Sequence, residues 1–537
     1  MILTEKGIQD TTAWEKAGYD MPHFNRSEMI EKTKKNPTWI HFGAGNIFRA
    51  FQANLMQRLL NQGEAETGLI AADGFDYEIV EKSYRPHDNL SVLVTLKADG
   101  TIDKTVIGSI AESCIMDSNR EDEFNRLREI FANPSLQMVS FSITEKGYDL
   151  KGADGNYRKD VSDDFAKSPE DKPQSYLGKL TALIYTRFKK SGAPLALVSM
   201  DNCSHNGEKL YNAVMPYVNA WCDNKLVEED FRTYVKSKVS FPWSMIDKIT
   251  PRPDKTVEAM LAKDDLDLTP AETSRHTFIA PFVNSEESEY LVIEDDFPNG
   301  RPALEKAGVI FTTRDTVNQV ERMKVTTCLN PLHTALAVYG CLLGYTRISE
   351  EMKDEDLLKL VKTLGYTEGL PVVTDPKIIN PKEFIDTVVE KRIPNPFMPD
   401  TPQRIATDTS RKLAIRYGET IKSYMANKDT DKLNMIPLVE AGWLRYLLAV
   451  DDNGSKFELS PDPLAADLTA KLSGLKTDGT TTREEAEKVL ADLLHNTAIF
   501  GVDLYEAGLA DKVLNDFVKL CNGKGAIRKT IHEAVNK

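Results

Sequence analysis

Cysteine and histidine are scarce in this sequence, and neither is spaced as a metal site. The 537 residues include six cysteines that form no CxxC pair and eight histidines that form no HExxH. We therefore expect reduced, mostly buried thiols and no dedicated metal site.

Basic charge and long apolar runs are scarce as well. Lysine and arginine total 67 against 82 acidic residues, for a net charge of −15, which disfavours nucleic acid and acidic membranes as partners. No apolar run reaches the roughly 18 residues of a membrane helix. The N-terminus lacks the basic-then-apolar pattern of a signal peptide. These absences predict a cytoplasmic protein and leave its oligomeric state open.

The sequence does contain enough apolar residues for large cores, at 41% hydrophobic. Its length predicts two or three domains. In the first half, short apolar runs alternate with helical patterns, which is typical of a mostly parallel sheet with helices on both faces. These runs are 39–42, 68–72, 138–143 and 195–200.

Helical periodicity dominates after residue 315. The clearest segments are 351–364, 381–392, 432–449, 482–495 and 504–520. We predict an α/β domain over residues 1–300 and a mostly α-helical domain over 301–537, with the junction near Pro298–Pro302. The polar stretch 149–174 is predicted to be a solvated surface loop rather than a mobile lid.

The segment WIHFGAGNIFRAF has the order strand, glycine turn, helix. Its glycines occupy the first two positions of a GxGxxG pattern, where glycine permits a tight turn and lets a pyrophosphate approach the backbone at a helix N-terminus. Phe48 takes the third position, so an ordinary strand–helix turn is an alternative. Arg49 either approaches the pyrophosphate or lies on the helix surface. The predicted cofactor-binding residues are Gly43, Gly45, Asn46, Ile47, Phe48 and Arg49.

A second predicted strand ends in Asp73, 30 residues after Gly43. Dinucleotide-binding domains place an acidic residue on the ribose hydroxyls at this strand end, about 20 residues after the first glycine. The longer first helix accounts for the difference. A carboxylate repels a 2′-phosphate, so the predicted cofactor is NAD rather than NADP. Asp76 is an alternative for this role.

The segment ERMKVTTCLNPLH places three polar side chains near one helix start. Pro331 predicts a helix with Asn330 as its N-cap, and His333 follows on the same side. Together with Lys324 they suit carbonyl reduction, because hydride addition leaves an oxygen that needs hydrogen-bond donors and a proton. By spacing alone, structural roles are favoured: a cap, a core histidine and a surface lysine.

A series of ordered motifs is more specific. Together they resemble the polyol-specific long-chain dehydrogenase family, which includes the mannitol dehydrogenases. The resemblance implies a Rossmann-type N-terminal domain, a helical C-terminal domain and a metal-independent active site between them. The motifs are GAGNIFRAF, SITEKGY (142–148), SMDNCSHNG (199–207), MIDKITP (245–251), VIEDDFPNGRP (292–302), ERMKVTTCLNPLHTALAVYG and RIPNPFMPDTPQRIATDTSRK (392–412).

The resemblance also implies roles for individual residues of this sequence. Lys324 would be the general acid/base, and Asn202, Asn330 and His333 would bind and polarise the reacting oxygen. The other residues that it places at the site are Glu321, for proton movement, and Asp247, Arg404 and Lys412, for substrate binding.

The lysine segment departs from the family pattern in one respect. One residue more than usual separates Lys324 from Asn330, and Asn-Pro-Leu-His stands where the family has Asn-Gly-Ser-His. An extra residue turns a regular helix by about 100°. A bulge or break near Cys328 is predicted to absorb it, and Pro331 favours a break.

The SITEKGY motif and the lysine segment resemble the uronate branch of the family more than they resemble the mannitol dehydrogenases. The predicted reaction is the NAD-dependent reduction of D-fructuronate to D-mannonate. Lys324, Arg404 and Lys412 suit a sugar-acid carboxylate, although they would serve a polyol equally well. Reduction of D-tagaturonate and oxidation of mannitol are the alternatives, and a non-catalytic dinucleotide-binding sensor is the alternative from another class.

Overall fold

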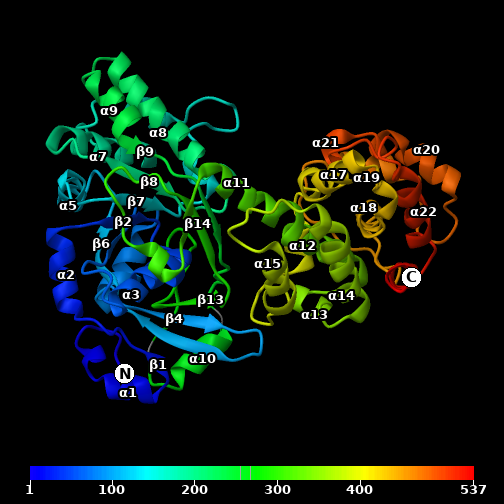
Figure 1. The fold of residues 1–537 in the computed structure, drawn as a ribbon, viewed down its shortest axis with the longest axis horizontal. Helices are drawn as coiled ribbons and strands as arrows, with labels where there is room; N and C mark the ends of the chain where they lie inside the picture. The colour runs from blue at the N-terminus through cyan, green and yellow to red at the C-terminus, as the bar shows by residue number, and fades with distance from the viewer. Residues whose placement is uncertain (254, 267) are drawn as a thin grey trace. The chain divides into compact units, whose positions relative to one another are not determined.

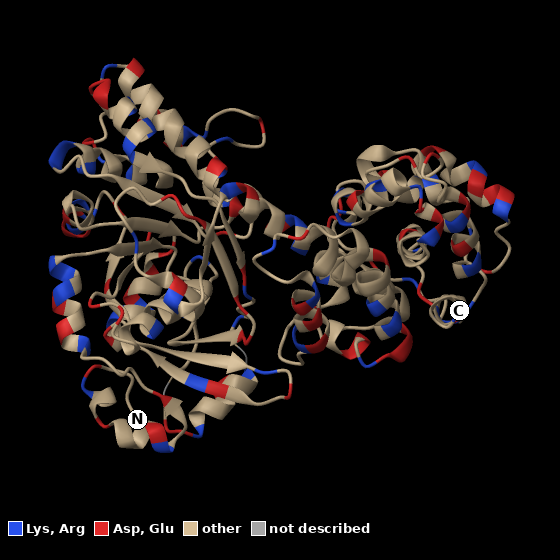
Figure 2. Cartoon of the chain, viewed as in Figure 1, with Lys and Arg blue, Asp and Glu red and all other residues tan. Residues whose placement is uncertain are grey.

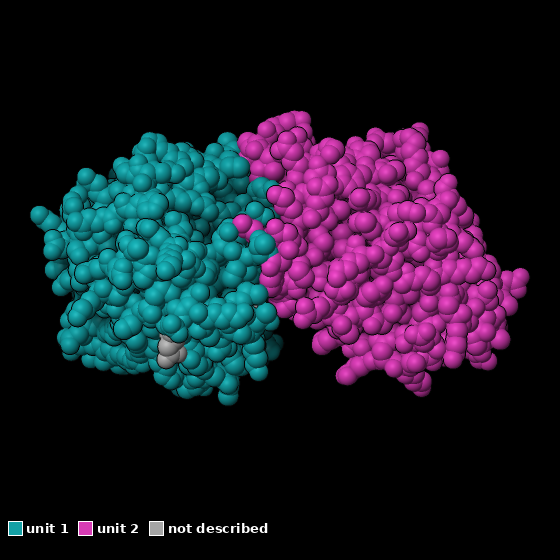
Figure 3. Space-filling model, turned by 90° about the horizontal axis from the view of Figure 1, so that it is seen from below, with its two compact units in different colours: residues 1–96, 101–318 teal, residues 97–100, 319–537 magenta. Residues whose placement is uncertain are grey.

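The structure, a computed structural model, describes residues 1–253, 255–266 and 268–537. They form two compact units, coloured separately in Figure 3. Unit 1 comprises residues 1–96 and 101–318, and unit 2 comprises residues 97–100 and 319–537. Figure 2 shows acidic and basic residues interspersed along the helices of both units. Within the described part of the chain, no helix combines the length and apolarity needed to cross a bilayer.

A six-stranded sheet forms the centre of unit 1 (Figure 1). Its strand pairs are all parallel, in the order β6-β3-β2-β7-β8-β9. Numbered along the chain within the sheet, this is the order 3-2-1-4-5-6 of a dinucleotide-binding domain, whose ligand crevice lies where the order reverses, here between β2 and β7. The strands are β2 (Trp39–Phe42), β3 (Leu69–Asp73), β6 (Ile110–Ile115), β7 (Met138–Phe141), β8 (Leu195–Ser199) and β9 (Val239–Ser240).

Both faces of this sheet are buried. Ile40 and Phe42 pack into one apolar cluster and Trp39 into another, as the two-residue alternation of a strand requires. Strands buried on both faces read as unbroken apolar runs, which confirms the predicted α/β fold. The first cluster includes side chains of α5 (Glu121–Ala132), α7 (Tyr176–Lys190), α8 (Asn206–Asp223) and α9 (Asp230–Lys238), and the second those of α3 (Ala53–Asn61).

Smaller sheets and helices complete unit 1. The sheets have the orders β1-β5-β4-β13, β10-β14-β15 and β11-β12. Their strands are β1 (Tyr19–Asp20), β4 (Ser91–Leu96), β5 (Ile102–Ile107), β10 (Ser244–Asp247), β11 (Ala271–Glu272), β12 (Phe278–Ile279), β13 (Phe282–Glu286), β14 (Tyr290–Glu294) and β15 (Ile310–Thr312). Further helices are α1 (Thr11–Lys16), α2 (Arg26–Lys35), α4 (Tyr77–Ile79), α6 (Lys159–Phe165) and α10 (Lys255–Ala262).

Two predictions about organisation differ from the structure. Residues 149–174 are not a plain loop, because they contain α6, and Asp164 accepts hydrogen bonds from the backbone N–H groups of Gln174 (3.0 Å) and Ser175 (2.8 Å). The units divide after Asn318 rather than near Pro298–Pro302, because β15 pairs with β14 and so belongs to unit 1.

Unit 2 is helical, as predicted. Its central helices α12 and α18 are buried over most of their length and pack on each other, which fits their nearly continuous apolar sequence. With α11 leading in from unit 1, the helices are α11 (Arg314–Met323), α12 (Asn330–Leu343), α13 (Ile348–Glu351), α14 (Glu355–Lys362), α15 (Pro381–Thr387), α16 (Pro402–Ile405), α17 (Glu419–Asn427), α18 (Met435–Tyr446), α19 (Ala465–Leu472), α20 (Arg483–Leu494), α21 (Thr497–Phe500), α22 (Ala510–Leu520) and α23 (Ala526–Val535).

Candidate functional site

The glycine turn follows β2 at the crevice. Gly43 has φ +107°, and a Cβ there would lie 2.2 Å from the Ser142 carbonyl oxygen, so this position requires glycine. A Cβ on Gly45 would have nothing within 4 Å. The first glycine is therefore needed by the fold itself, whereas the second leaves open space beside the backbone at the start of the helix.

Phe48, at the third position of the glycine pattern, is fully buried. Its ring stacks on His41 at 4.6 Å between centroids and 11° between planes. The His41 ring lies between Ser140 Oγ (2.6 Å) and Ser142 Oγ (2.8 Å), and burial lowers the pKa of His41 to about 3. Phe48 thus closes the helix against the strand by aromatic stacking, where the common pattern uses a glycine for close packing.

Arg49 lies inside unit 1 and is 2% exposed. Its guanidinium donates to the Ala280 carbonyl oxygen (2.6 Å) and to Asn46 Oδ1 (3.1 Å). The alternative that it lies on a solvated helix surface is therefore wrong. Asn46 and Ile47 are partly exposed at the helix start.

Asp73 ends β3, as predicted, and is 5% exposed. One carboxylate oxygen accepts the Ala44 N–H (3.1 Å), and the other accepts those of Phe75 and Asp76 (both 2.8 Å). Burial raises the pKa of Asp73, and these hydrogen bonds oppose that effect. The carboxylate thus joins the glycine turn to the loop after β3. Asp76 accepts a hydrogen bond from the hydroxyl of Thr273 (2.6 Å).

The turn after β7 has a strained residue. Thr144 has φ 65° and ψ 158°, a region that is essentially restricted to glycine and costs about 1–3 kcal/mol for other residues. Asp201, after β8, accepts the backbone N–H groups of Ile143 (3.1 Å) and Thr144 (2.7 Å). Sequence reasoning missed both Thr144 and Asp201, although SITEKGY and SMDNCSHNG contain them.

The other predicted residues of unit 1 lie on separate elements. Asn202 is exposed and follows Asp201. Asp247 is the last residue of β10 and is 6% exposed. Tyr176, at the start of α7, was not predicted; among the described residues its buried hydroxyl has no hydrogen-bond partner. Its ring lies against Gly74, in the loop after β3.

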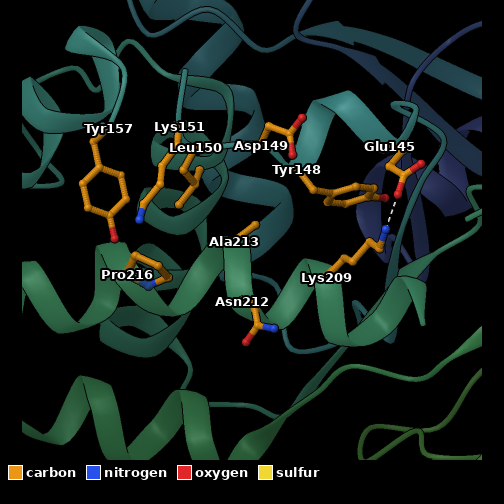
Figure 4. A pocket seen from close by; sticks show the side chains of 10 residues that line it. All are labelled: Glu145, Tyr148, Asp149, Leu150, Lys151, Tyr157, Lys209, Asn212, Ala213 and Pro216. Carbon is orange, nitrogen blue, oxygen red and sulfur yellow. Dashed lines mark hydrogen bonds and ion pairs between the residues drawn. The ribbon is translucent and has the colours of Figure 1, made fainter. Parts of the chain in front are cut away.

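A half-open cavity of about 400 Å³ in unit 1 contains none of the predicted residues. Figure 4 shows Lys209 of α8 paired with Glu145 at one end. Two lysines and two carboxylates line it, so their charges balance: Lys151, Lys209, Glu145 and Asp149. It therefore offers no excess of positive charge to a sugar acid.

In unit 2, the predicted bulge near Cys328 is present. A single π-helical turn, Lys324–Cys328, is closed by a hydrogen bond from the Leu329 N–H to the Lys324 carbonyl oxygen (3.1 Å). Leu329 then breaks the helix, with φ −133° and ψ −62°. A π turn holds one residue more than an α-helical turn, so it accommodates the insertion. The predicted N-cap is off by one, because Leu329 rather than Asn330 precedes α12.

The lysine itself is buried. Lys324 is 4% exposed, and Glu321 lies one turn earlier on α11 with partial exposure. Asn330, at the start of α12, is also partly exposed. The prediction that Lys324 is a solvated surface charge is therefore wrong.

His333 lies in a charged environment on α12. Its side chain is 14% exposed, and Nε2 is 3.8 Å from Asp400 Oδ2. Burial, together with nearby arginines and against the effect of Asp400, lowers the pKa of His333 to about 4. The imidazole is therefore neutral at pH 7, with one N–H to donate.

Three arginines lie near this histidine, and Lys412 lies near two of them. Arg392, Arg404 and Arg416 each act on the pKa of His333, and Arg404 and Arg416 both lower the pKa of Lys412, after burial as the main cause. Arg416 donates to Thr334, Lys412 to the Thr407 carbonyl and Arg404 to Asp400. We call Arg392, Arg404, Lys412 and Arg416 the cation group. Arg392 and Arg416 were not predicted.

The low pKa of His333 predicts how its protonation depends on pH. An ordinary histidine titrates near 6.5, so between pH 4 and 6.5 the unfolded chain binds a proton that the folded chain does not. This difference reduces the free energy of unfolding as pH falls, by roughly 1.4 kcal/mol per pH unit. In 13C-histidine NMR, the His333 signal is identified as the one that is missing from the spectrum of His333→Asn. In the folded parent protein, its chemical shift is expected to stay constant between pH 5.5 and 8. A midpoint near 6.5 would contradict the burial argument.

Both units of the chain match domain models of known proteins. Residues 37–306 match the model of the mannitol dehydrogenase Rossmann domain, and residues 316–521 match that of the mannitol dehydrogenase C-terminal domain. The chain is 49% identical to the D-mannonate oxidoreductase of Thermotoga maritima, over 100% of this chain and 99% of that protein.

Two solved structures have the same fold. One is a Pseudomonas fluorescens mannitol 2-dehydrogenase in ternary complex with NAD and D-mannitol, with a TM-score of 0.69, 24% identity and 100% coverage of both chains. The other is a substrate-free D-sorbitol dehydrogenase, with a TM-score of 0.76, 23% identity and coverage of 96% of this chain and 100% of that chain.

Proposed function

Because the chain belongs to the mannitol dehydrogenase family, we propose that this oxidoreductase of polyols or sugar acids reduces D-fructuronate to D-mannonate with NADH. The observation that carries the proposal is the 49% identity to a D-mannonate oxidoreductase over the whole chain. Relatives named for mannitol are more distant, such as the mannitol 2-dehydrogenase of Aspergillus oryzae at 28%.

The glycine turn fits a dinucleotide. Gly45 leaves room for a pyrophosphate beside the backbone, and the helix start supplies N–H groups and a positive dipole end. The Asp73 carboxylate at the end of β3 supports NAD over NADP through repulsion of a 2′-phosphate. When bound, NADH supplies the hydride to the ketone carbon.

We assign the proton to Lys324. As negative charge develops on the ketone oxygen, an ammonium can donate a hydrogen bond and then the proton. His333 does not supply the proton at pH 7, because with a pKa of about 4 it is a neutral imidazole rather than an imidazolium. Its remaining N–H, with the amide of Asn330, would polarise the oxygen, and Glu321 would exchange the proton with solvent.

The cation group supports a sugar acid as substrate. The whole chain carries a net charge of −15, yet the four cations of the cation group have three carboxylates near them, Asp400 beside His333 and Asp408 and Asp462 beside Lys412. Replacing Arg404 by glutamine is expected to raise KM for D-fructuronate about tenfold to 100-fold, because a hydrogen bond to a charged group contributes about 1.5–3 kcal/mol. The rate with the neutral ketose D-fructose is expected to change less than threefold.

A control for this substitution is Lys382→Gln, which removes an exposed cation paired with Asp386. Steady-state NADH oxidation at several substrate concentrations separates KM from kcat. If Arg404→Gln weakened the binding of both substrates equally, the substrate carboxylate would bind elsewhere, and Lys412 would be the next residue to test.

The reaction is tested by initial rates of NADH oxidation with D-fructuronate, D-tagaturonate and D-fructose, each repeated with NADPH. We expect the highest kcat/KM with D-fructuronate and NADH. Preference for D-tagaturonate would show that the enzyme selects the other substrate stereochemistry. Preference for D-fructose would show that it does not require a substrate carboxylate. NADH binding without NADH oxidation in the presence of any of these ketones would favour a non-catalytic dinucleotide-binding sensor.

A further inference from the structure

The loops after β2, β7 and β8 meet at the crevice of unit 1. The Ser142 N–H donates to the Phe42 carbonyl oxygen (2.9 Å), and Ser142 Oγ donates to that of Gly43 (3.2 Å). The turn that begins with Ser142 therefore contacts the glycine turn directly. In a doubly wound sheet the second half of the strand order receives the second mononucleotide, so this turn lies on the nicotinamide side.

This turn contains the strained Thr144. A residue with a branched Cβ is disfavoured at φ 65° and ψ 158°. Such a conformation persists when surrounding contacts over-determine it. The structure shows those contacts, and they converge on one carboxylate.

Asp201 accepts three hydrogen bonds from the segment after β7. Oδ1 accepts the Thr144 N–H (2.7 Å), and Oδ2 accepts the Ile143 N–H (3.1 Å) and the Tyr148 hydroxyl (2.5 Å). Asp201 is 8% exposed, and it directly precedes Asn202. A single side chain thus joins the ends of two neighbouring parallel strands, β7 and β8.

We propose that Asp201 is a positioning residue for hydride transfer: its carboxylate holds the strained Ile143–Thr144 peptide, and so fixes the loop on the nicotinamide side of the crevice together with Asn202. This proposal rests on the proposed NAD-dependent activity. An asparagine at position 201 has one acceptor oxygen instead of two, so it cannot accept both backbone N–H groups in the same way.

The test compares Asp201→Asn, Thr144→Gly and the double variant. Asp201→Asn is expected to lower kcat about 100-fold, to raise the Kd for NADH about tenfold and to increase the primary isotope effect with 4-deuterated NADH. Thr144→Gly is expected to stay within threefold of the parent protein. In the double variant glycine adopts the conformation without strain, so we expect kcat to recover at least tenfold from the Asp201→Asn value.

Tyr148→Phe is the matched control, because it removes the contacts of the hydroxyl with Asp201 and Ser199 and leaves the carboxylate and both of its backbone contacts. It is expected to keep kcat within threefold. The proposal is overturned if Asp201→Asn lowers the melting temperature while kcat, Kd and the isotope effect stay unchanged, or if Thr144→Gly gives no rescue. The Kd for NADH tests the positioning role even if D-fructuronate proves not to be the substrate.

A second measurement uses the unaltered protein. Hydrogen exchange with and without NADH is expected to show the amides of Ile143 and Thr144 protected in both states, because Asp201 already holds them. Rapid exchange of these amides without NADH would overturn the proposal, whether or not the variants fold.

Discussion

Replacing Lys324 by alanine is expected to lower kcat by about 10³-fold or more, from loss of the proton donor and of a charge beside the developing oxyanion. NADH binding is expected to remain within threefold, because the glycine turn and Asp73 belong to unit 1. Lys324 is 4% exposed, so its alkyl chain also packs, and a modest loss of stability is expected. The measurements are single-turnover NADH oxidation and fluorescence titration of NADH.

Two further observations separate proton transfer from charge. Lys324→Arg keeps a cation that does not release its proton, and it is expected to remain as slow as the alanine variant. Added primary amines are expected to restore part of the activity of Lys324→Ala and none of that of Lys324→Arg. If the activity of Lys324→Ala stayed within tenfold of that of the parent protein, another residue would have to supply the proton.

Alanine substitutions of the two glycines in the turn are expected to have different effects, on stability at Gly43 and on NADH affinity at Gly45. Gly43→Ala would place a Cβ 2.2 Å from the Ser142 carbonyl oxygen at φ +107°. The free energy of unfolding of unit 1 is expected to fall by about 3 kcal/mol or more. A Cβ on Gly45 meets nothing within 4 Å, so Gly45→Ala is expected to change stability by less than about 0.5 kcal/mol. Its Kd for NADH is expected to rise about 100-fold, which corresponds to about 2.7 kcal/mol.

Thermal melts and NADH titrations of both variants, each in parallel with the parent protein, distinguish these outcomes. Because each glycine serves as the control for the other, a general effect of alanine in the turn is excluded. Unchanged NADH affinity in Gly45→Ala would show that the pyrophosphate does not approach this backbone. An unaltered melt of Gly43→Ala would contradict the close approach to Ser142.

The sequence was most informative where one local pattern determines the structure. Strands buried on both faces gave recognisable runs, and Asp73 could be placed because a strand ends there. The extra residue before Asn330 predicted a bulge near Cys328, and a π turn occupies that place. The helix start shifted by one residue because Leu329, not Asn330, adopts the non-helical conformation.

Contacts between distant segments were not predictable in the same way. The burial of Arg49 depends on the carbonyl group of Ala280, 231 residues away. Thr144 has no sequence signal for strain, because its conformation is held by Asp201 from another strand end. Arg392 and Arg416 stand within or beside a recognised motif, but their relation to His333 depends on how the helices of unit 2 pack.

The π turn has a consequence for how segment length varies among relatives. Nine residues of regular helix rotate by about 900°, or two and a half turns, which would send Lys324 and His333 to opposite sides. The π turn and the break at Leu329 interrupt the regular helix between Lys324 and α12. The direction in which the lysine side chain points therefore does not determine how α12 is rotated about its axis. A one-residue difference in length can then change the width of the turn and leave the direction of the later helix unaltered. Relatives with the shorter spacing can therefore present the same lysine, asparagine and histidine, and a sequence alignment should place its gap within residues 325–328.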